Sequence, residues 1–158
     1  MKPAPITYLK KELQQRPAAE LLEICLRLAR FKKENKELLT YLLFESYNEQ
    51  AYIDAIKKEM GQQFAEINKG NLYFAKKSIR KIVRDTNKFI RYSGHKKTEV
   101  ELLLHFCRCL NNSGIPMDKS VALQNIYTRQ IQKIKKTLGA LHEDLQFDYE
   151  EELRVLGV

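Results

Sequence analysis

Apolar residues recur every three or four positions along nearly the whole chain, and this spacing is the strongest constraint on its fold. The segment Ile53, Ile56, Met60, Phe64 and Ile67 is a clear example. Such spacing gathers apolar side chains on one face of an α-helix, whereas a half-buried strand needs strict alternation. Because convincing alternation is absent from the sequence, the pattern predicts an all-α protein.

Residues that break helices are scarce. Glycine occurs 6 times and proline 4 times in 158 residues, about half the usual share. Few turn residues disfavour a many-stranded β-sandwich or barrel. With 44% hydrophobic residues, the chain can bury a core of ordinary size. We therefore predict one all-helical domain over residues 1–158, in which residues 1–5 form a disordered segment and residues 142–158 an acidic C-terminal helix.

Seven or eight helices are expected, with breaks where Gly, Pro or polar runs interrupt the apolar pattern. The predicted helices span about residues 6–16, 17–31, 35–43, 46–67, 72–92, 98–111, 116–138 and 142–156. The fourth helix is expected to start at the Ser46-x-x-Glu49 spacing of a capping box. The alternative is one long, bent helix that continues through Tyr47.

Short loops make consecutive helices antiparallel neighbours. Hairpins that stack on one another would form a HEAT-like α-α superhelix, and hairpins that wrap around one core would form a compact multi-helix bundle. A repeat of fixed period would decide between them, and the sequence contains none. The HEAT-like superhelix is the preferred interpretation.

The segment PAAELLEICLRLARFKKENKELLTYLLFE resembles a HEAT-type hairpin. It is also similar to small uncharacterised all-helical bacterial proteins. The resemblance covers about 30 residues and depends on leucine spacing. It implies a helical architecture and a role in binding, and it assigns no functional residue.

The positive charge of the chain is local. Between Lys69 and Lys97 there are ten basic residues and one acid, Asp85, a net charge of +9. Since the whole chain carries +8, the other 129 residues sum to −1. The basicity therefore belongs to the helix predicted after Gly70 and to its flanks.

At about 100° per residue, the basic side chains of this helix gather in one sector, opposite the apolar one. The predicted polyanion-binding residues are Tyr73, Lys76, Lys77, Arg80, Lys81, Arg84, Lys88 and Arg91. A row of cations beside an aromatic ring that can stack suits a nucleic acid or another polyanion. Two plainer interpretations stay open: a merely solvated helix face, and a face covered by the six acids of Glu143–Glu152.

Motifs of catalysis and of metal binding are absent. The sequence contains no GxGxxG, P-loop, GxSxG, HExxH or EF-hand pattern. Cys107 and Cys109 would lie about 200° apart on a helix, so they cannot share one ion. His105 and Cys109 share a face, but a closed zinc site needs two further ligands. We predict buried structural thiols, no metal or other cofactor, and no enzymatic activity.

Aromatic residues cluster around the third and fourth predicted helices. Tyr47 and Tyr52 are the candidate partner-binding residues there, because tyrosine is frequent at interaction hot spots. The leading functional prediction is a non-catalytic binding or scaffold module that engages a protein partner. Nucleic-acid binding through the basic helix over residues 72–92 is the alternative, and association with a membrane surface is a third class.

The cellular context is predicted from absences. No apolar run approaches the roughly 18 residues of a membrane span, and the N-terminus lacks an apolar stretch of signal-peptide length. Three cysteines do not make a disulfide framework. These features predict a cytoplasmic protein of bacterial type without a transmembrane segment, and they leave self-association open.

Overall fold

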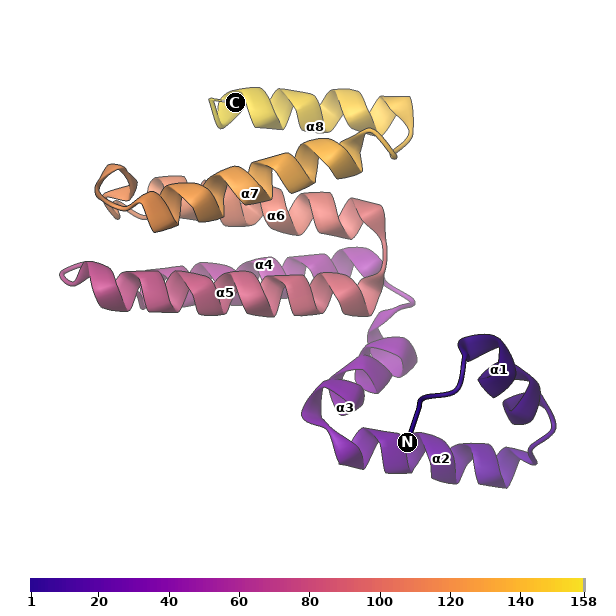
Figure 1. Cartoon of the computed structure of the whole chain (residues 1–158). Coiled ribbons are helices and arrows are strands. Elements are labelled where there is room, and N and C mark those ends of the chain that lie inside the picture. The colour runs from indigo at the N-terminus through magenta and orange to yellow at the C-terminus, as the bar shows by residue number, and fades with distance from the viewer. Residues whose placement is uncertain (158) are drawn as a thin grey trace. The chain divides into compact units, whose positions relative to one another are not determined.

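The computed structural model describes residues 1–157, and every regular element in this range is helical (Figure 1). The prediction of an all-α protein with seven to eight helices is therefore confirmed. The helices are α1 (Ile6–Gln14), α2 (Ala18–Phe31), α3 (Lys33–Thr40), α4 (Glu49–Ala65), α5 (Leu72–Ser93), α6 (Lys96–Asn112), α7 (Val121–Leu138) and α8 (Glu143–Val155).

Contacts group the chain into two compact units, residues 1–44 and the chain from Glu45 onward. Each unit is described by itself below. The single-domain interpretation stays a prediction, because the grouping does not show whether either unit folds alone.

Unit 1 holds α1, α2 and α3. Pro5 and Pro17 immediately precede α1 and α2, where the fixed φ of proline suits the start of a helix. A single extended residue, Lys32, separates α2 from α3. The amide of Asn35 donates a hydrogen bond to the carbonyl oxygen of Leu28 at 2.8 Å. These features make α2 and α3 a short hairpin.

The chain leaves α3 through a π-helical turn, Tyr41–Glu45, and α4 begins at Glu49. The alternative of one bent helix through Tyr47 is therefore wrong. The capping-box prediction is also wrong, because the side chain of Asn48 caps α4 by accepting from the backbone N–H of Ala51 at 3.1 Å. Asn48 stands directly before the first helical residue, which is where a capping side chain reaches the orphan N–H groups.

Unit 2 is built from antiparallel hairpins around a central helix. Helices α4 and α5 form one hairpin, α6 and α7 form the next, and α8 packs on α6 and α7 (Figure 1). Helix α6 contacts all four of the others. The consecutive residues Leu102, Leu103 and Leu104 point to different sides of α6, yet each is at most 1% exposed. A helix that is apolar all round must have neighbours all round, so α6 is the core of unit 2.

The helix boundaries in unit 2 follow the predicted stop signals. The predicted 72–92 helix is observed as Leu72–Ser93, capped at its start by the Asn71 side chain. It ends at Gly94, whose φ of 70° lies in the left-handed region. The HEAT-like character of the stacking stays a prediction.

Two glycines offer a paired test of helix energetics. Gly94→Ala should lower the free energy of unfolding by about 1 kcal/mol, because a Cβ is strained at positive φ. Gly61→Ala should raise it by up to about 1 kcal/mol, because Gly61 lies inside α4 and an added Cβ would meet nothing within 4 Å. Urea denaturation followed by circular dichroism measures both. If both variants shift the free energy of unfolding equally and in the same direction, the left-handed cap at Gly94 and the position of Gly61 inside α4 would both be contradicted.

Candidate polyanion-binding surface

Helix α5 has two opposite faces. Its buried residues recur at intervals of three and four, and they are Ala75, Ile79, Ile82, Thr86 and Ile90. At about 100° per residue, these five positions lie opposite the sector that holds the basic side chains. The burial of the apolar face against the rest of unit 2 therefore directs the cations outward.

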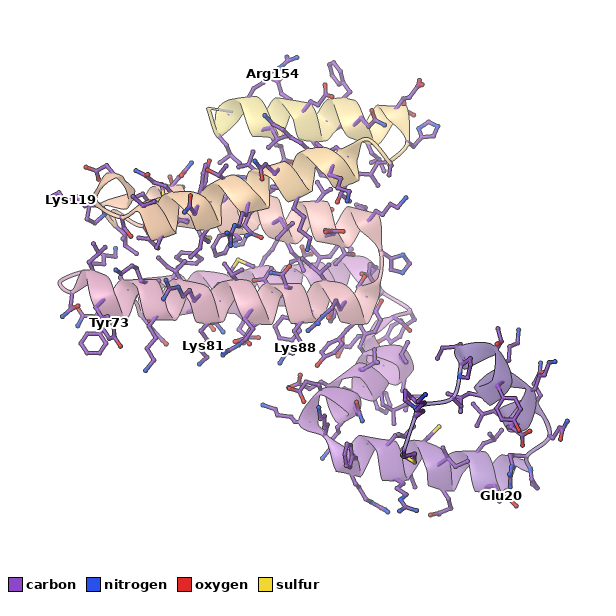
Figure 2. All side chains as sticks on the ribbon, in the orientation of Figure 1. Glu20, Tyr73, Lys81, Lys88, Lys119 and Arg154 are labelled. Atoms are coloured by element: carbon purple, nitrogen blue, oxygen red, sulfur yellow. The ribbon has the colours of Figure 1, made fainter. Side chains whose placement is uncertain are left out.

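The structure leaves most of the predicted polyanion-binding residues exposed. Tyr73, Lys77, Arg80, Lys81, Arg84 and Arg91 are exposed, and Lys76 and Lys88 are half-buried. Figure 2 shows Tyr73, Lys81 and Lys88 on the side of α5 that points away from the α6–α7 hairpin. We call these eight residues the α5 stripe.

Aromatic rings lie at both ends of the stripe. The ring of Tyr73 is 67% exposed and meets Phe74 edge-on, with 5.4 Å between the ring centroids. Near the other end, the ammonium of Lys88 lies 5.1 Å from the centroid of the Phe89 ring. Phe74 is itself half exposed, and sequence reasoning missed it because its angular position lies between the cationic sector and the apolar sector and belongs to neither. The pair Tyr73–Phe74 offers a flat apolar surface next to the cations.

Negative charge is scarce beside the stripe. Asp85 is the single acid of α5, its side chain is 23% exposed, and its Oδ1 lies 3.9 Å from Arg84 Nε. It lies in the groove toward α4 together with Glu59, on the flank of α5 and not at its outer face. The α5 stripe thus has one acid on its own helix, at its flank.

The acidic C-terminal helix does not cover the stripe within unit 2. Helix α8 buries Tyr149 and Leu153, and it packs against α6 and α7. Figure 1 shows it on the far side of unit 2 from α5. Its Glu152 pairs with Arg108 of α6. The interpretation that these acids neutralise the stripe by docking on it is therefore wrong, because the apolar face of α8 is committed elsewhere.

A half-buried carboxylate, that of Glu101, connects helices α4, α6 and α8. Glu101 of α6 accepts a hydrogen bond from the Lys57 ammonium of α4 at 2.6 Å and one from the Tyr149 hydroxyl of α8 at 3.1 Å. Burial by itself raises the pKa of Glu101. The pKa of Glu101 is nevertheless lowered below its usual 4.5. The opposing effects together exceed that of burial: the hydrogen bond and charge of Lys57, the hydrogen bond from the Tyr149 hydroxyl, and the charge of Lys97. The charged form of Glu101 therefore stabilises the fold.

Glu101→Gln should lower the free energy of unfolding by about 2 kcal/mol at pH 7. A lowered folded-state pKa adds stability above the unfolded-state value, and this stability is lost as pH falls through the folded-state pKa. The difference in the free energy of unfolding between the wild type and Glu101→Gln should therefore become smaller as the pH falls from 5 to 3. Urea unfolding at both pH values measures it, and a difference that stays constant would contradict the role assigned to the charge.

The two candidate partner-binding tyrosines lie in different environments. Tyr47 is 85% exposed, whereas Tyr52 is 7% exposed and its hydroxyl donates to the carbonyl oxygen of Phe89 at 3.0 Å. Tyr52 thus ties α4 to α5 as a core residue. The structure does not bring the two side chains together on one surface, because Tyr47 precedes α4 and Tyr52 lies on its buried face.

The histidine and cysteine cluster of α6 behaves as a structural one. Cys107 is fully buried, and burial raises its pKa to about 12. His105 Nε2 lies 3.1 Å from the carbonyl oxygen of Lys57 and 3.4 Å from Cys109 Sγ, and burial lowers the pKa of His105. Among residues 1–157, no group of three or more potential ligands is placed to hold a metal ion.

Comparison with known proteins gives no information on function, so the proposals below are argued from the residues of this chain. No family model, no curated protein and no solved structure matches this chain. In the part of the chain that the structure describes, no helix is both long and apolar enough to span a bilayer.

Proposed function

We propose that the protein is a non-catalytic module that binds the phosphate backbone of nucleic acid through the α5 stripe. The observation that carries this proposal is an outward row of cations on one rigid helix, with a single acid at its flank. A helix face whose only role is to be soluble does not need an excess of cations, because a mixture of positive and negative side chains is solvated equally well.

The length of the row suits a chain of phosphates. From Lys77 to Arg91 the helix rises by about 21 Å at 1.5 Å per residue. One strand of B-form DNA places a phosphate about every 3.4 Å along the axis, so the row spans roughly six phosphates. The exposed rings of Tyr73 and Phe74 add a surface on which an unpaired base can stack.

Membrane association fits the stripe less well. A helix that lies in a bilayer surface needs an exposed apolar face beside its cations. The apolar face of α5 is buried in unit 2, apart from Tyr73 and Phe74 at one end. The stripe therefore supports contacts with charged groups more than insertion into lipid.

The test is the salt dependence of binding. We would titrate the protein into a fluorescein-labelled 20-base-pair duplex and the corresponding 20-nucleotide strand at 50 and 200 mM NaCl. Release of counterions from about five neutralised phosphates should raise Kd by roughly 10² to 10³ between the two salt concentrations. Absence of binding at 50 mM, or tighter binding to vesicles containing phosphatidylserine than to the duplex, would overturn the proposal.

We propose protein association through unit 1 as a second function, on a separate observation. None of the side chains of α1, α2 and α3 is buried, and several large apolar ones are exposed, among them Leu28 at 54% and Phe31 at 77%. Exposed apolar surface of this kind is typical of interaction sites. A shallow hollow of about 220 Å³ between α2 and α3 is lined by Cys25, Leu28, Ala29, Asn35, Leu38, Leu39 and Leu42.

This hollow suits the apolar face of a helix, and α2 of a second copy of the chain is the partner that we would test. Light scattering during gel filtration at 2 to 200 μM should show a mass that rises toward twice 18.6 kDa. The variant Leu28→Glu should stay monomeric, and Val121→Glu serves as the control at an exposed position outside the hollow. A wild-type protein that is monomeric throughout this range would contradict self-association.

A further inference from the structure

Helix α7 is a second basic helix in unit 2. It carries Arg129, Lys133, Lys135 and Lys136 and no acidic residue. Arg129 and Lys136 of α7 are exposed. Helix α8, by contrast, has a net charge of −5. Since α5 has a net charge of +6 and α4 of −1, positive charge in unit 2 is concentrated on α5 and α7.

Side-chain contacts place α7 next to α5. The ammonium of Lys133 donates to Asn87 Oδ1 of α5 at 2.8 Å and pairs with Glu99 Oε1 of α6 at 3.1 Å. In Figure 1, α5 and α7 lie on the same side of unit 2, in front of α4 and α6. Lys133 is therefore a bridge between the helices, and Glu99 compensates its charge.

The two helices run in the same direction, because each is antiparallel to α6, which lies between them in the sequence (Figure 1). The Lys133–Asn87 contact gives a common reference point along the two helices. About one turn before it lie Arg129 of α7 and Arg84 of α5, and about one turn after it lie Lys136 and Arg91. Four exposed cations thus surround the bridge in two parallel rows.

The two rows lie on either side of the bridge. At about 100° per residue, Arg91 lies about 40° and Arg84 about 60° from Asn87 around α5, so both point further outward than the position that contacts α7. On α7, Arg129 and Lys136 lie on the flank that carries Lys133. Lys135 points the other way, into a hollow shared with Glu150 and Arg154 of α8.

We propose that the α5 and α7 rows bind the two strands of a nucleic-acid duplex, one row to each strand. This inference rests on the proposed function and names the class of nucleic acid. A single strand offers one line of phosphates, which the α5 stripe can follow alone. A duplex groove offers two lines, and only a duplex engages both rows of cations at once.

The test compares a variant of each row on duplex and single-stranded DNA. Arg129→Glu with Lys136→Glu should weaken binding to the 20-base-pair duplex at least 10-fold and reduce the salt slope by about two. The same variant should change binding to the 20-nucleotide strand less than 2-fold. The control is Lys119→Glu with Lys135→Glu, which makes the same charge change around α7 away from the rows. Figure 2 shows Lys119 at the loop before α7.

Each outcome decides one of the two proposals. Unchanged duplex binding by the Arg129, Lys136 variant overturns the two-row inference and leaves the α5 stripe intact. An equal loss on duplex and single strand also overturns it, because α7 would then contribute only general attraction. No binding of the wild type to either DNA overturns the proposed function itself.

Discussion

Replacing Lys77 and Arg84 by glutamate should weaken duplex binding by roughly two orders of magnitude and at the same time stabilise the protein. Both side chains are exposed on the α5 stripe, so the variant loses two phosphate contacts and gains two repulsions. The salt slope of binding should fall by about two. Fluorescence anisotropy with the labelled duplex at 50 mM NaCl measures the loss.

The expected gain in stability has a local cause. Lys77 is four residues from Lys81, and Arg84 is four residues from both Arg80 and Lys88. Like charges at this spacing repel on a helix, and each pair of opposite charges is worth about 0.2–0.5 kcal/mol. The two substitutions turn three repulsive pairs into attractive ones, and this gain exceeds the loss of the exposed Arg84–Asp85 pair at 3.9 Å. The free energy of unfolding should therefore rise by about 1 kcal/mol.

A matched control separates the stripe from general charge. Lys58→Glu with Lys119→Glu makes the same change in net charge at exposed positions on α4 and in the loop before α7. It should weaken duplex binding less than 5-fold. If both double variants weaken binding equally, the α5 stripe is not the binding surface, and general attraction to a basic protein explains the affinity.

Replacing Phe106 by alanine should cost about 3–5 kcal/mol, the usual range for a large aromatic side chain in a well-packed core. Phe106 is fully buried in α6, and its ring lies 5.5 Å from that of Phe64 in α4. Because α6 contacts every other helix of unit 2, a cavity there weakens the whole unit. Urea denaturation at 25 °C, followed by circular dichroism, measures the change.

The control is Phe147→Ala on α8, which removes the same atoms from a side chain that is 69% exposed. This substitution should change the free energy of unfolding by less than about 0.5 kcal/mol. A cost at Phe106 that is no larger than the cost at Phe147 would contradict the central place of α6.

The α5 stripe was predictable because it depends on local geometry. The caps at Asn71 and Gly94 bound one helix, and the 3.6-residue period then separates its basic sector from its apolar one. The start of α4 was harder to predict. Ser46-x-x-Glu49 has the spacing of a capping box, but Asn48 accepts the backbone hydrogen bond, and two capping residues so close in sequence cannot be ranked without coordinates.

Tertiary packing decided which helices share a surface. The pairing of Lys133 with Asn87 joins residues 46 positions apart, and the docking of α8 on α6 and α7 leaves α5 uncovered in unit 2. It also made Tyr52 a core residue and left Tyr47 exposed. The sequence by itself determined the helices and the cationic face of α5, because hydrogen bonding and helical periodicity are local. Only the tertiary structure could decide that α7 stands beside α5, because side-chain packing joins segments that are distant along the chain.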